Sequence, residues 1–346
     1  SNYGDRPPSS EIASQERGGL RFSEDPVNIS HNSDYNFDGE FTVSMHTKSI
    51  VADMQRGPEN LNEVSSCSEL QNMNPSSNYY LSSDIDCSGV DFTPVGWGTG
   101  SSSFDGEEFT GYFDGRGHTI SNVSIAPSGG DYYAAIFPIV GTEGEVIDFT
   151  LEDSDSTGTN PSGLISARNK GLIRDVTIID SRHYGANYQA AIVAGDNYGI
   201  IRNVGVREST VEAGNNFVGG ITGNMPQGRV ERSYFIGSIG DTSSPGSDVG
   251  GIAGQATGGD IENVYSVANV TGSSATGAVV GDLQTNLRNV NWDNEKSINS
   301  EALGDKNDAN YDLESRSTSQ MKDEGSLSLF DFETDWMFAA GENQGY

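Results

Sequence analysis

The chain has 346 residues, of which 34% are hydrophobic and 44 are glycine. It carries 50 Asp and Glu residues against 19 Lys and Arg residues, a formal net charge of −31. This charge argues against nucleic acid as a partner, because phosphates repel an acidic surface, and it favours a protein that works in molar salt over an acidic cation-binding surface. No segment has the length and apolar character of a transmembrane helix.

The first sixty residues divide into two predicted parts. Residues 1–18 are polar and predict an extended arm, because they offer little apolar surface to bury. Residues 19–60 predict an N-terminal β segment, either a cap over the first coil of the repeat region or a partial sandwich. The chain starts at Ser1 without a signal peptide, so we expect a mature product or a fragment.

Residues 61–115, which we expect to form the entry region of the repeat fold described below, hold the two cysteines, Cys67 and Cys87. Cysteines so close in sequence are compatible with a disulfide, which would indicate an oxidising compartment, although their number alone does not establish one.

Residues 116–296 contain a repeat of about 28 residues. Short segments that read apolar-x-Asn/Asp-apolar, such as IRNV, begin at Ile120, Val146, Ile173, Ile201, Val230, Ile261 and Leu287. A second series, such as GGITG, interleaves with the first at Ile136, Leu164, Ile192, Ile221, Ile252 and Val279. Such short, Gly-rich units cannot bury an apolar face alone, so they must stack on one another.

The repeat predicts an all-β fold, a right-handed parallel β-helix of about seven coils, with residues 297–346 as a C-terminal extension or cap. Alternating apolar residues, such as Val176 and Ile178, predict inward-facing columns. In particular, we expect Ile120, Ile173, Ile201 and Ile261 to form one buried file.

The polar positions of the first motif predict two further columns. Its third residue forms a ladder of stacked amides and carboxylates that Arg232 interrupts, at Asn122, Asp148, Asp175, Asn203, Arg232, Asn263 and Asn289. Its second residue predicts two ion pairs between neighbouring coils, Arg202 with Glu231 and Glu262 with Arg288.

These motifs resemble the GLUG repeat family, as in VGGITGNMPQGRVERSYFIGS from Val218 and VGGIAGQATGGDIENVYSVANVTGS from Val249. CSELQNM from Cys67, GYFDGRGHTISNVSI from Gly111 and FDFETDWMF from Phe330 are similar to the flanking regions of such proteins. The resemblance implies a β-helix on secreted or cell-surface proteins and assigns no activity. Residues 19–49 weakly resemble one edge of a laminin-G-like sandwich.

Familiar catalytic motifs are missing from the sequence. None of His31, His46, His118 and His183 belongs to a His-Glu-x-x-His zinc site, and no Gly-x-Ser-x-Gly elbow or phosphate-binding loop occurs. We expect His118 to be structural. No catalytic residue is assigned and no cofactor is required, and the alternative is a polysaccharide lyase or glycosidase with carboxylates on one exposed face.

Two kinds of site remain as expectations. The segment GDKNDANYD suggests a weak calcium site at Asp305, Asn307, Asp308, Asn310 and Asp312, and a solvated loop is an equal alternative. Asp153 and Asp155 form a second weak candidate. Asn-x-Ser/Thr sequons predict glycosylation of an exported chain at Asn28 and Asn269, and less readily at Asn122, which we place in an inner ladder.

Together these features predict a non-enzymatic extracellular module, a spike, decoration or adhesion protein of a halophilic cell or its virion. We expect its partners to be a surface glycan, a protein receptor or neighbouring structural subunits. By analogy with other β-helical spikes, a homotrimer is the expected oligomer.

Overall fold

The computed structural model divides the chain into two units, the second of which is Lys48–Tyr346. It describes residues 57–58, 60–98, 104–125, 133–214, 216–240, 246–297, 301–307, 310–332 and 336, all within the second unit. The predicted arm and the laminin-G-like stretch, with Asn28, His31 and His46, lie outside the described residues.

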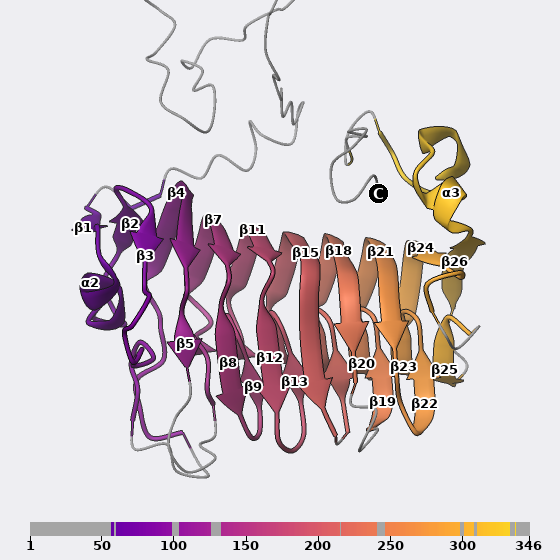
Figure 1. The fold of residues 1–346 in the computed structure, drawn as a ribbon, viewed down its shortest axis with the longest axis horizontal. Coiled ribbons are helices and arrows are strands. Elements are labelled where there is room, and N and C mark those ends of the chain that lie inside the picture. Colours follow the sequence, from indigo (N-terminus) through magenta and orange to yellow (C-terminus); the bar gives the residue numbers. More distant parts are fainter. Residues whose placement is uncertain are drawn as a thin grey trace, which may run out of the picture. The chain divides into compact units, whose positions relative to one another are not determined.

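The second unit is a parallel β-helix, which confirms the predicted fold class. Its strands form three parallel sheets, and successive coils lie side by side in chain order (Figure 1). The main path of the large sheet consists of β1 (Asn62–Val64), β2 (Tyr79–Leu81), β4 (Tyr112–Ser121), β7 (Glu145–Glu152), β11 (Leu172–Ile179), β15 (Ile200–Ala213), β18 (Arg229–Ile239), β21 (Asp260–Val270), β24 (Asn286–Asp293) and β26 (Tyr311–Arg316). Beside this path, the same sheet includes β3 (Ile85–Asp86), β5 (Ser124–Ile125), β8 (Asp155–Gly158) and β12 (Arg182–Gly185).

The other two sheets complete each coil. One consists of β6 (Phe137–Val140), β10 (Ser166–Asn169), β14 (Ala194–Asn197), β17 (Thr222–Met225), β20 (Ala253–Ala256), β23 (Val280–Leu283) and β25 (Leu303–Lys306). The third consists of β9 (Ser162–Gly163), β13 (Ala190–Ala191), β16 (Val218–Gly219), β19 (Ser247–Gly250) and β22 (Ser274–Gly277). The parallel stacking continues past residue 296 into β25 and β26, so these two strands continue the solenoid.

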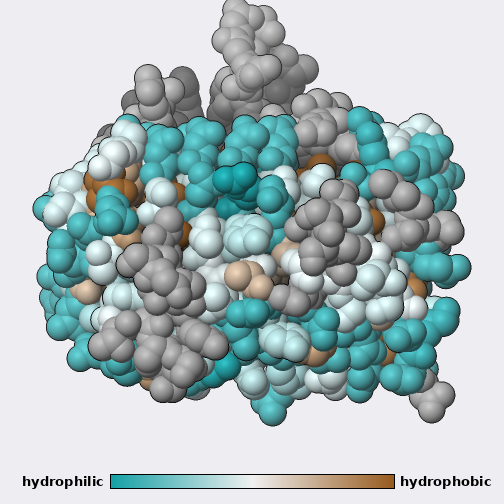
Figure 2. Space-filling view, turned by 60° about the horizontal axis from the view of Figure 1, so that its bottom comes forward, coloured by the Kyte–Doolittle hydropathy of each residue, from teal (hydrophilic) through white to brown (hydrophobic). Residues whose placement is uncertain are grey.

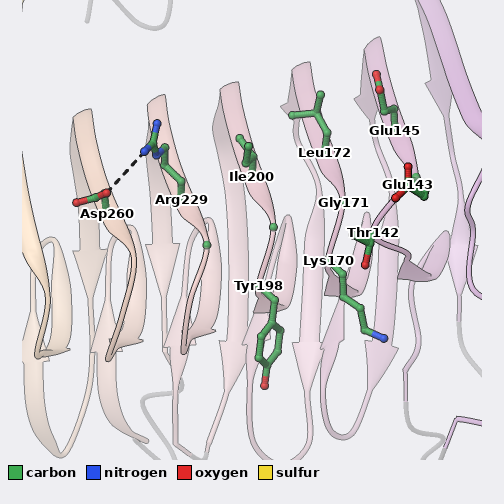
Figure 3. Close-up of a pocket in the computed structure, with 13 residues that line it drawn as sticks. Thr142, Glu143, Glu145, Lys170, Gly171, Leu172, Tyr198, Ile200, Arg229 and Asp260 are labelled. Atoms are coloured by element: carbon green, nitrogen blue, oxygen red, sulfur yellow. Dashed lines mark ion pairs between the residues drawn. The ribbon is translucent and has the colours of Figure 1, made fainter.

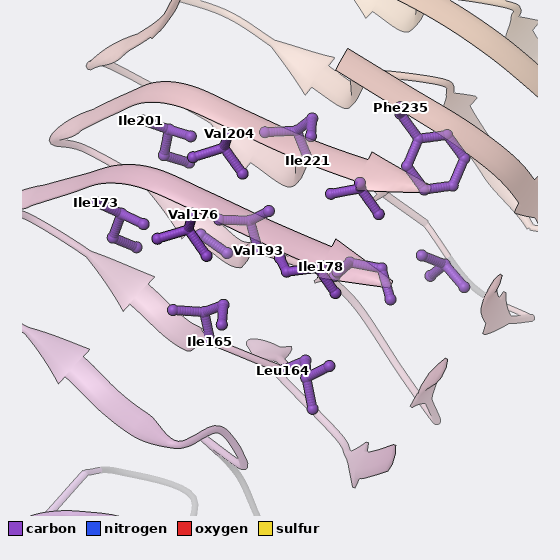
Figure 4. Close-up of a cluster of buried hydrophobic side chains, with 14 of the residues drawn as sticks. Leu164, Ile165, Ile173, Val176, Ile178, Val193, Ile201, Val204, Ile221 and Phe235 are labelled. Carbon is purple, nitrogen blue, oxygen red and sulfur yellow. The ribbon is translucent and has the colours of Figure 1, made fainter. Parts of the chain in front are cut away.

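The core consists of files of identical or similar side chains, one from each coil. Ile173 pairs in register with Ile201, and Val176 pairs with Val204, and all four side chains are buried (Figure 4). The second motif series forms another buried file, from Ile136 to Val279. Each coil therefore covers the apolar face of its neighbour, which explains why the units fold only as a stack.

The strands of the large sheet bend at two places in a coil, and both bends share one local sequence signature. Because the signature does not tell the two bends apart, one predicted register changes. The first bend places Asp175 and Asn203 in the left-handed region, with φ of 55° and 52°, and the second does the same to Asp153 and Asp180. Asparagine and aspartate tolerate this conformation better than other residues with side chains. Either bend therefore gives an apolar-x-Asn/Asp pattern.

The expected file that began at Ile120 is therefore wrong at its first member. Ile120 is buried, but it pairs with Leu151 at the second bend, whereas Phe113 pairs with Val146. The aligned series starts at Phe113 and Val146 and continues through Ile173, Ile201 and Ile261. The motif at Ile120 belongs to the second bend.

The third-residue ladder lies on the outer surface, and Arg232 continues it. Asn203 Nδ2 donates to Asp175 Oδ1 at 2.8 Å, and Arg232 Nε donates to Asn203 Oδ1 at 2.9 Å. On the side of Asn203 the column therefore continues through Arg232, although a guanidinium has no acceptor with which to pass the ladder on as an amide does. The predicted ion pairs are confirmed: Arg202 pairs with Glu231, and Arg288 Nη2 lies 2.8 Å from Glu262 Oε2.

Each end of the solenoid carries a short helix. At the start, helix α2 (Cys67–Gln71) is joined to the residue after β3 by a Cys67–Cys87 disulfide with a Cα–Cα distance of 5.2 Å. At the end, helix α3 (Thr318–Met321) and the 3-10 helix η1 (Glu324–Ser326) lead into a second apolar cluster. There Met321, Leu327 and Phe330 pack with Tyr265 of the large sheet. The last segment thus covers a lateral face of the β-helix.

Candidate functional site

A groove follows the turns that join the seven-stranded sheet to the large sheet. We call it the corner groove (Figure 3); its volume is about 610 Å³. It crosses five coils, because its lining comes from the turns before β7, β11, β15, β18 and β21. These residues are Thr142, Glu143, Gly144, Glu145, Lys170, Gly171, Leu172, Tyr198, Gly199, Ile200, Gly228, Arg229 and Asp260.

A glycine from each of the first four turns forms the floor of the groove. A Cβ on Gly199 would lie 2.2 Å from the carbonyl oxygen of Gly171, and a Cβ on Gly171 would lie 2.2 Å from that of Gly144. No side chain fits at that distance, so neighbouring turns approach backbone to backbone. The carbonyl of Gly171 accepts a hydrogen bond from Ile200 N at 2.8 Å, so this backbone is already paired within the solenoid.

Buried amides beneath the floor fix the turns. Asn169 and Asn197 are fully buried, and Asn169 Nδ2 donates to Asn197 Oδ1 at 2.9 Å. Their side-chain oxygens accept hydrogen bonds from the backbone N–H groups of Gly171 and Gly199, at 3.1 and 3.2 Å. The floor is held by hydrogen bonds that do not involve solvent, which makes it a preorganised surface.

The middle of the groove is apolar and its ends are charged. Glu145, Leu172, Ile200, Arg229 and Asp260 occupy one register column on successive strands and form one row in Figure 3. Leu172 and Ile200, both partly exposed, are the central members. The groove therefore offers an aliphatic strip between polar ends.

The cations of the groove already have acidic partners. Lys170 Nζ lies 2.6 Å from Glu108 Oε1. Arg229 lies 3.7 Å from Asp260 and 3.6 Å from Glu231. The groove thus presents little uncompensated positive charge to a ligand.

Tyr198 stands on the other side of the glycine turns, opposite the aliphatic strip (Figure 3). Its side chain is 40% exposed. The Arg168 guanidinium lies 5.6 Å from the Tyr198 ring centroid and 5.5 Å from that of Tyr133. Asp196 Oδ2 accepts hydrogen bonds from this guanidinium at 2.8 and 3.1 Å, and although burial lowers the pKa of Arg168, Asp196 raises it overall. The Arg168 guanidinium thus lies against the Tyr198 ring, while the residue stays 40% exposed.

The predicted calcium residues lie on two different sheets. Asp305 is in β25, opposite Asp282, whereas Asp312 is in β26, and Asp308 lies outside the described residues. Burial raises the pKa of Asp248, and the negative charges of Asp282 and Asp305 raise it further. Among the described residues, no group of three His, Cys, Asp or Glu side chains is arranged to hold a metal ion.

The second acidic candidate has another explanation. Asp153 sits at the second bend with φ 49°, and Asp155 Oδ1 lies 3.3 Å from Arg182 Nε on the next coil. Both residues therefore serve the stacking of the coils.

Both sequons within the described residues have exposed asparagines. Asn269 is exposed on β21. Asn122 is also exposed, and its Nδ2 donates to Asp86 Oδ1 at 2.9 Å, so its placement in an inner ladder is wrong. The reason is that the left-handed Asn or Asp residue of either bend faces outward. Glycosylation of either residue stays a prediction.

The two described histidines have different environments. His118 Nδ1 lies 3.1 Å from Asp84 Oδ1 near the surface. His183 is completely buried, with Ser156 Oγ 2.7 Å from Nδ1 and Ser162 Oγ 3.0 Å from Nε2. Burial lowers its pKa to about 3.

Sequence reasoning missed the corner groove. The signal for it is the glycine that stands two residues before the aligned apolar residue in successive motifs, at Gly144, Gly171, Gly199 and Gly228. Tyr198 follows from no periodicity, because the corresponding positions in neighbouring coils hold Glu143 and Lys170.

Comparisons with known proteins bear on the fold and on a limited part of the sequence. No family model matches the chain. The fold is similar to that of a putative immunoglobulin A1 protease from Bacteroides ovatus, with a TM-score of 0.60 and 19% identity, over 84% of this chain and 92% of the other. That identity supports likeness of fold alone.

A second similarity lies in the sequence itself. The chain is 37% identical over 132 residues to halomucin from Haloquadratum walsbyi. The matched region covers 35% of this chain and 1% of halomucin. The chain thus matches only a small part of a very long protein. Within the described residues, no helix is long and apolar enough to cross a membrane.

Proposed function

We propose that this chain is a non-enzymatic extracellular module, a structural or adhesion element on the surface of a halophilic organism or its virus. The similarity to halomucin over 132 residues carries the proposal, because it joins this acidic solenoid to a protein of a named halophile. By the same proposal, its coils are GLUG repeats.

The charge of the chain gives this role a physical basis. Acidic residues exceed basic ones by 31, and hydrophilic side chains cover much of the face shown in Figure 2. In dilute buffer these carboxylates repel one another and oppose compaction. Molar salt shortens the Debye length to about 3 Å and thereby weakens the repulsion.

Salt-dependent unfolding tests the adaptation to salt. We expect the denaturation midpoint to rise steadily with NaCl from dilute buffer into the molar range, with KCl giving a similar curve. Adding CaCl₂ at constant ionic strength separates screening from specific calcium binding. A midpoint that is independent of NaCl would contradict the salt-adapted role.

Location and lack of activity need separate measurements. Antibodies against the chain should label intact source cells or free virus particles without permeabilisation. The carbohydrate-active enzyme remains the alternative, and incubation with neutral and acidic polysaccharides in molar NaCl decides between them. Release of shorter or unsaturated sugars would replace our proposal with that alternative.

A further inference from the structure

We propose that the corner groove binds a linear, neutral glycan laid along the axis of the β-helix. The juxtaposition that carries this inference is an exposed tyrosine, Tyr198, and an aliphatic strip, Leu172 and Ile200, on the two sides of a row of glycines in one groove. The proposal goes beyond the role in salt, and either one can fail without the other.

The shape of the groove fits an extended polymer. It runs across successive coils, because four turns each contribute a glycine and the column residue that follows it, and the fifth coil contributes Asp260. Coils about 4.8 Å apart give it a length of about 19 Å over four intervals. Such a length holds a short run of sugar rings and is excessive for a single small molecule.

The chemistry of the walls matches a sugar ring. A pyranose has faces of C–H groups and a rim of hydroxyls, so it needs an apolar surface beside polar groups. Tyr198 and the strip of Leu172 and Ile200 supply apolar surfaces. Glu143, Glu145 and the Arg229–Asp260 pair supply hydroxyl partners at the two ends.

The charges favour a neutral glycan. Lys170 and Arg229 already pair with Glu108 and Asp260, so neither is a free counter-charge for an acidic sugar.

The backbone of the floor argues against a peptide strand. An extended peptide gains affinity mainly by pairing with free N–H and C=O groups at a sheet edge. Here the carbonyls of Gly144, Gly171 and Gly199 already accept hydrogen bonds from the next coil, at 2.9, 2.8 and 2.8 Å. Recognition must therefore come from side chains and shape.

Binding should be measured on the full chain in molar NaCl, where the charges are screened. Co-sedimentation with cellulose, mannan, xylan and chitin identifies a neutral polymer, and calorimetric titration with its oligosaccharides gives the affinity. We expect affinity to rise with oligosaccharide length up to about four rings, the span of the groove, and then to level off.

Two tyrosines of similar exposure form a matched pair of variants. Tyr198→Ala removes the ring from the groove, and we expect the Kd to rise roughly tenfold or more, as for an aromatic anchor in a binding site. Tyr184→Ala removes a ring that is 43% exposed on β12, outside the groove, and should leave the Kd unchanged. Circular dichroism of both variants confirms that they fold.

Leu172→Asp adds an independent check, because it places a charge in the strip and should also raise the Kd, with circular dichroism to confirm that this variant folds. Three outcomes would overturn the proposal: no retention by any neutral polysaccharide, equal loss of affinity in the Tyr198 and Tyr184 variants, or binding confined to acidic glycans such as polygalacturonate or to extended peptides.

Discussion

The Nδ1 atom of His183 lies 2.7 Å from the hydroxyl oxygen of Ser156, in a part of the core that contains no other imidazole among the described residues. Its Nε2 atom lies 3.0 Å from Ser162 Oγ, so two hydroxyls satisfy both ring nitrogens of a neutral ring. Protonation inside this core is costly, because burial disfavours the charged ring and both of these hydrogen-bond partners are uncharged.

This burial predicts that acid destabilises the fold through His183. Its pKa falls from 6.5 to about 3 on folding, so below pH 6.5 the unfolded chain binds a proton that the folded chain does not. The contribution of His183 to stability is complete above pH 6.5 and is lost towards pH 3, at about 1.4 kcal/mol per pH unit. Urea unfolding at a series of pH values measures this slope.

Two variants separate the pH dependence of stability that His183 causes from the part that the many carboxylates cause. His183→Asn should be less stable than the parent at neutral pH, and the difference should shrink as the pH falls below 6.5. Val176→Ala also weakens the core but alters no titratable group. Its loss of unfolding free energy relative to the parent should therefore be the same at every pH. A constant deficit for His183→Asn would contradict the prediction.

The first bend predicts an unusual order of substitutions at Asn203. Its φ is 52°, and its side chain bonds to Asp175 and Arg232. Asn203→Gly keeps the backbone conformation and loses only the ladder bonds, at a cost of about 1 kcal/mol. Asn203→Ala adds backbone strain of about 1 kcal/mol, so it should be the less stable variant in chemical denaturation. The reverse order would contradict the prediction, because it would show that left-handed strain costs alanine less than folding costs glycine in backbone entropy.

The glycine floor predicts a severe effect from one methyl group. Gly199→Ala places Cβ against the carbonyl of Gly171, and backbone cannot move aside as a flexible side chain can. We expect a loss of at least about 2 kcal/mol in unfolding free energy. Gly325→Ala is the control, because its Cβ would have its nearest neighbour at 3.7 Å. Equal stability of the two variants would indicate that the turns can separate at little cost.

The disulfide predicts local stabilisation of the first coil. Cys67 and Cys87 are 20 residues apart, and a crosslink across a loop of this length contributes about 3 kcal/mol. The double variant Cys67→Ala, Cys87→Ala should show faster amide exchange in α2 and β3 than the parent. Exchange in β15 and β18, far along the stack, should change much less. Uniform acceleration along the stack would mean that the coils unfold as a single unit.

The sequence was sufficient to predict the stack but not every register. The spacing of Ile173, Ile201 and Ile261 correctly identified a buried file, because one coil must match the next in length. It failed at Ile120 because the left-handed bend, and not the file itself, selects the Asn/Asp signature, and each coil can bend twice. The local pattern alone therefore left two registers open.

The corner groove depends on contacts between neighbouring coils, and the spacing of the repeats does not reveal these contacts. The glycines at Gly171 and Gly199 are visible in the sequence, but their role depends on how closely two turns approach. Tyr198 gains its position from Arg168, whose guanidinium is held by Asp196 on the next strand. Such relationships across coils appear only once the register is known.

The direction of the hydrogen bonds has a mechanical consequence. Bonds such as Ile200 N to Gly171 O join one coil to the next, so a pull along the stacking direction loads each set of bonds in opening and not in shear. A stack loaded in this way should peel from an end, and each released coil of about 28 residues would lengthen the chain by about 90 Å. The disulfide beside α2 and the packing of Phe330 on Tyr265 lie near opposite ends of this stack, where such peeling would start.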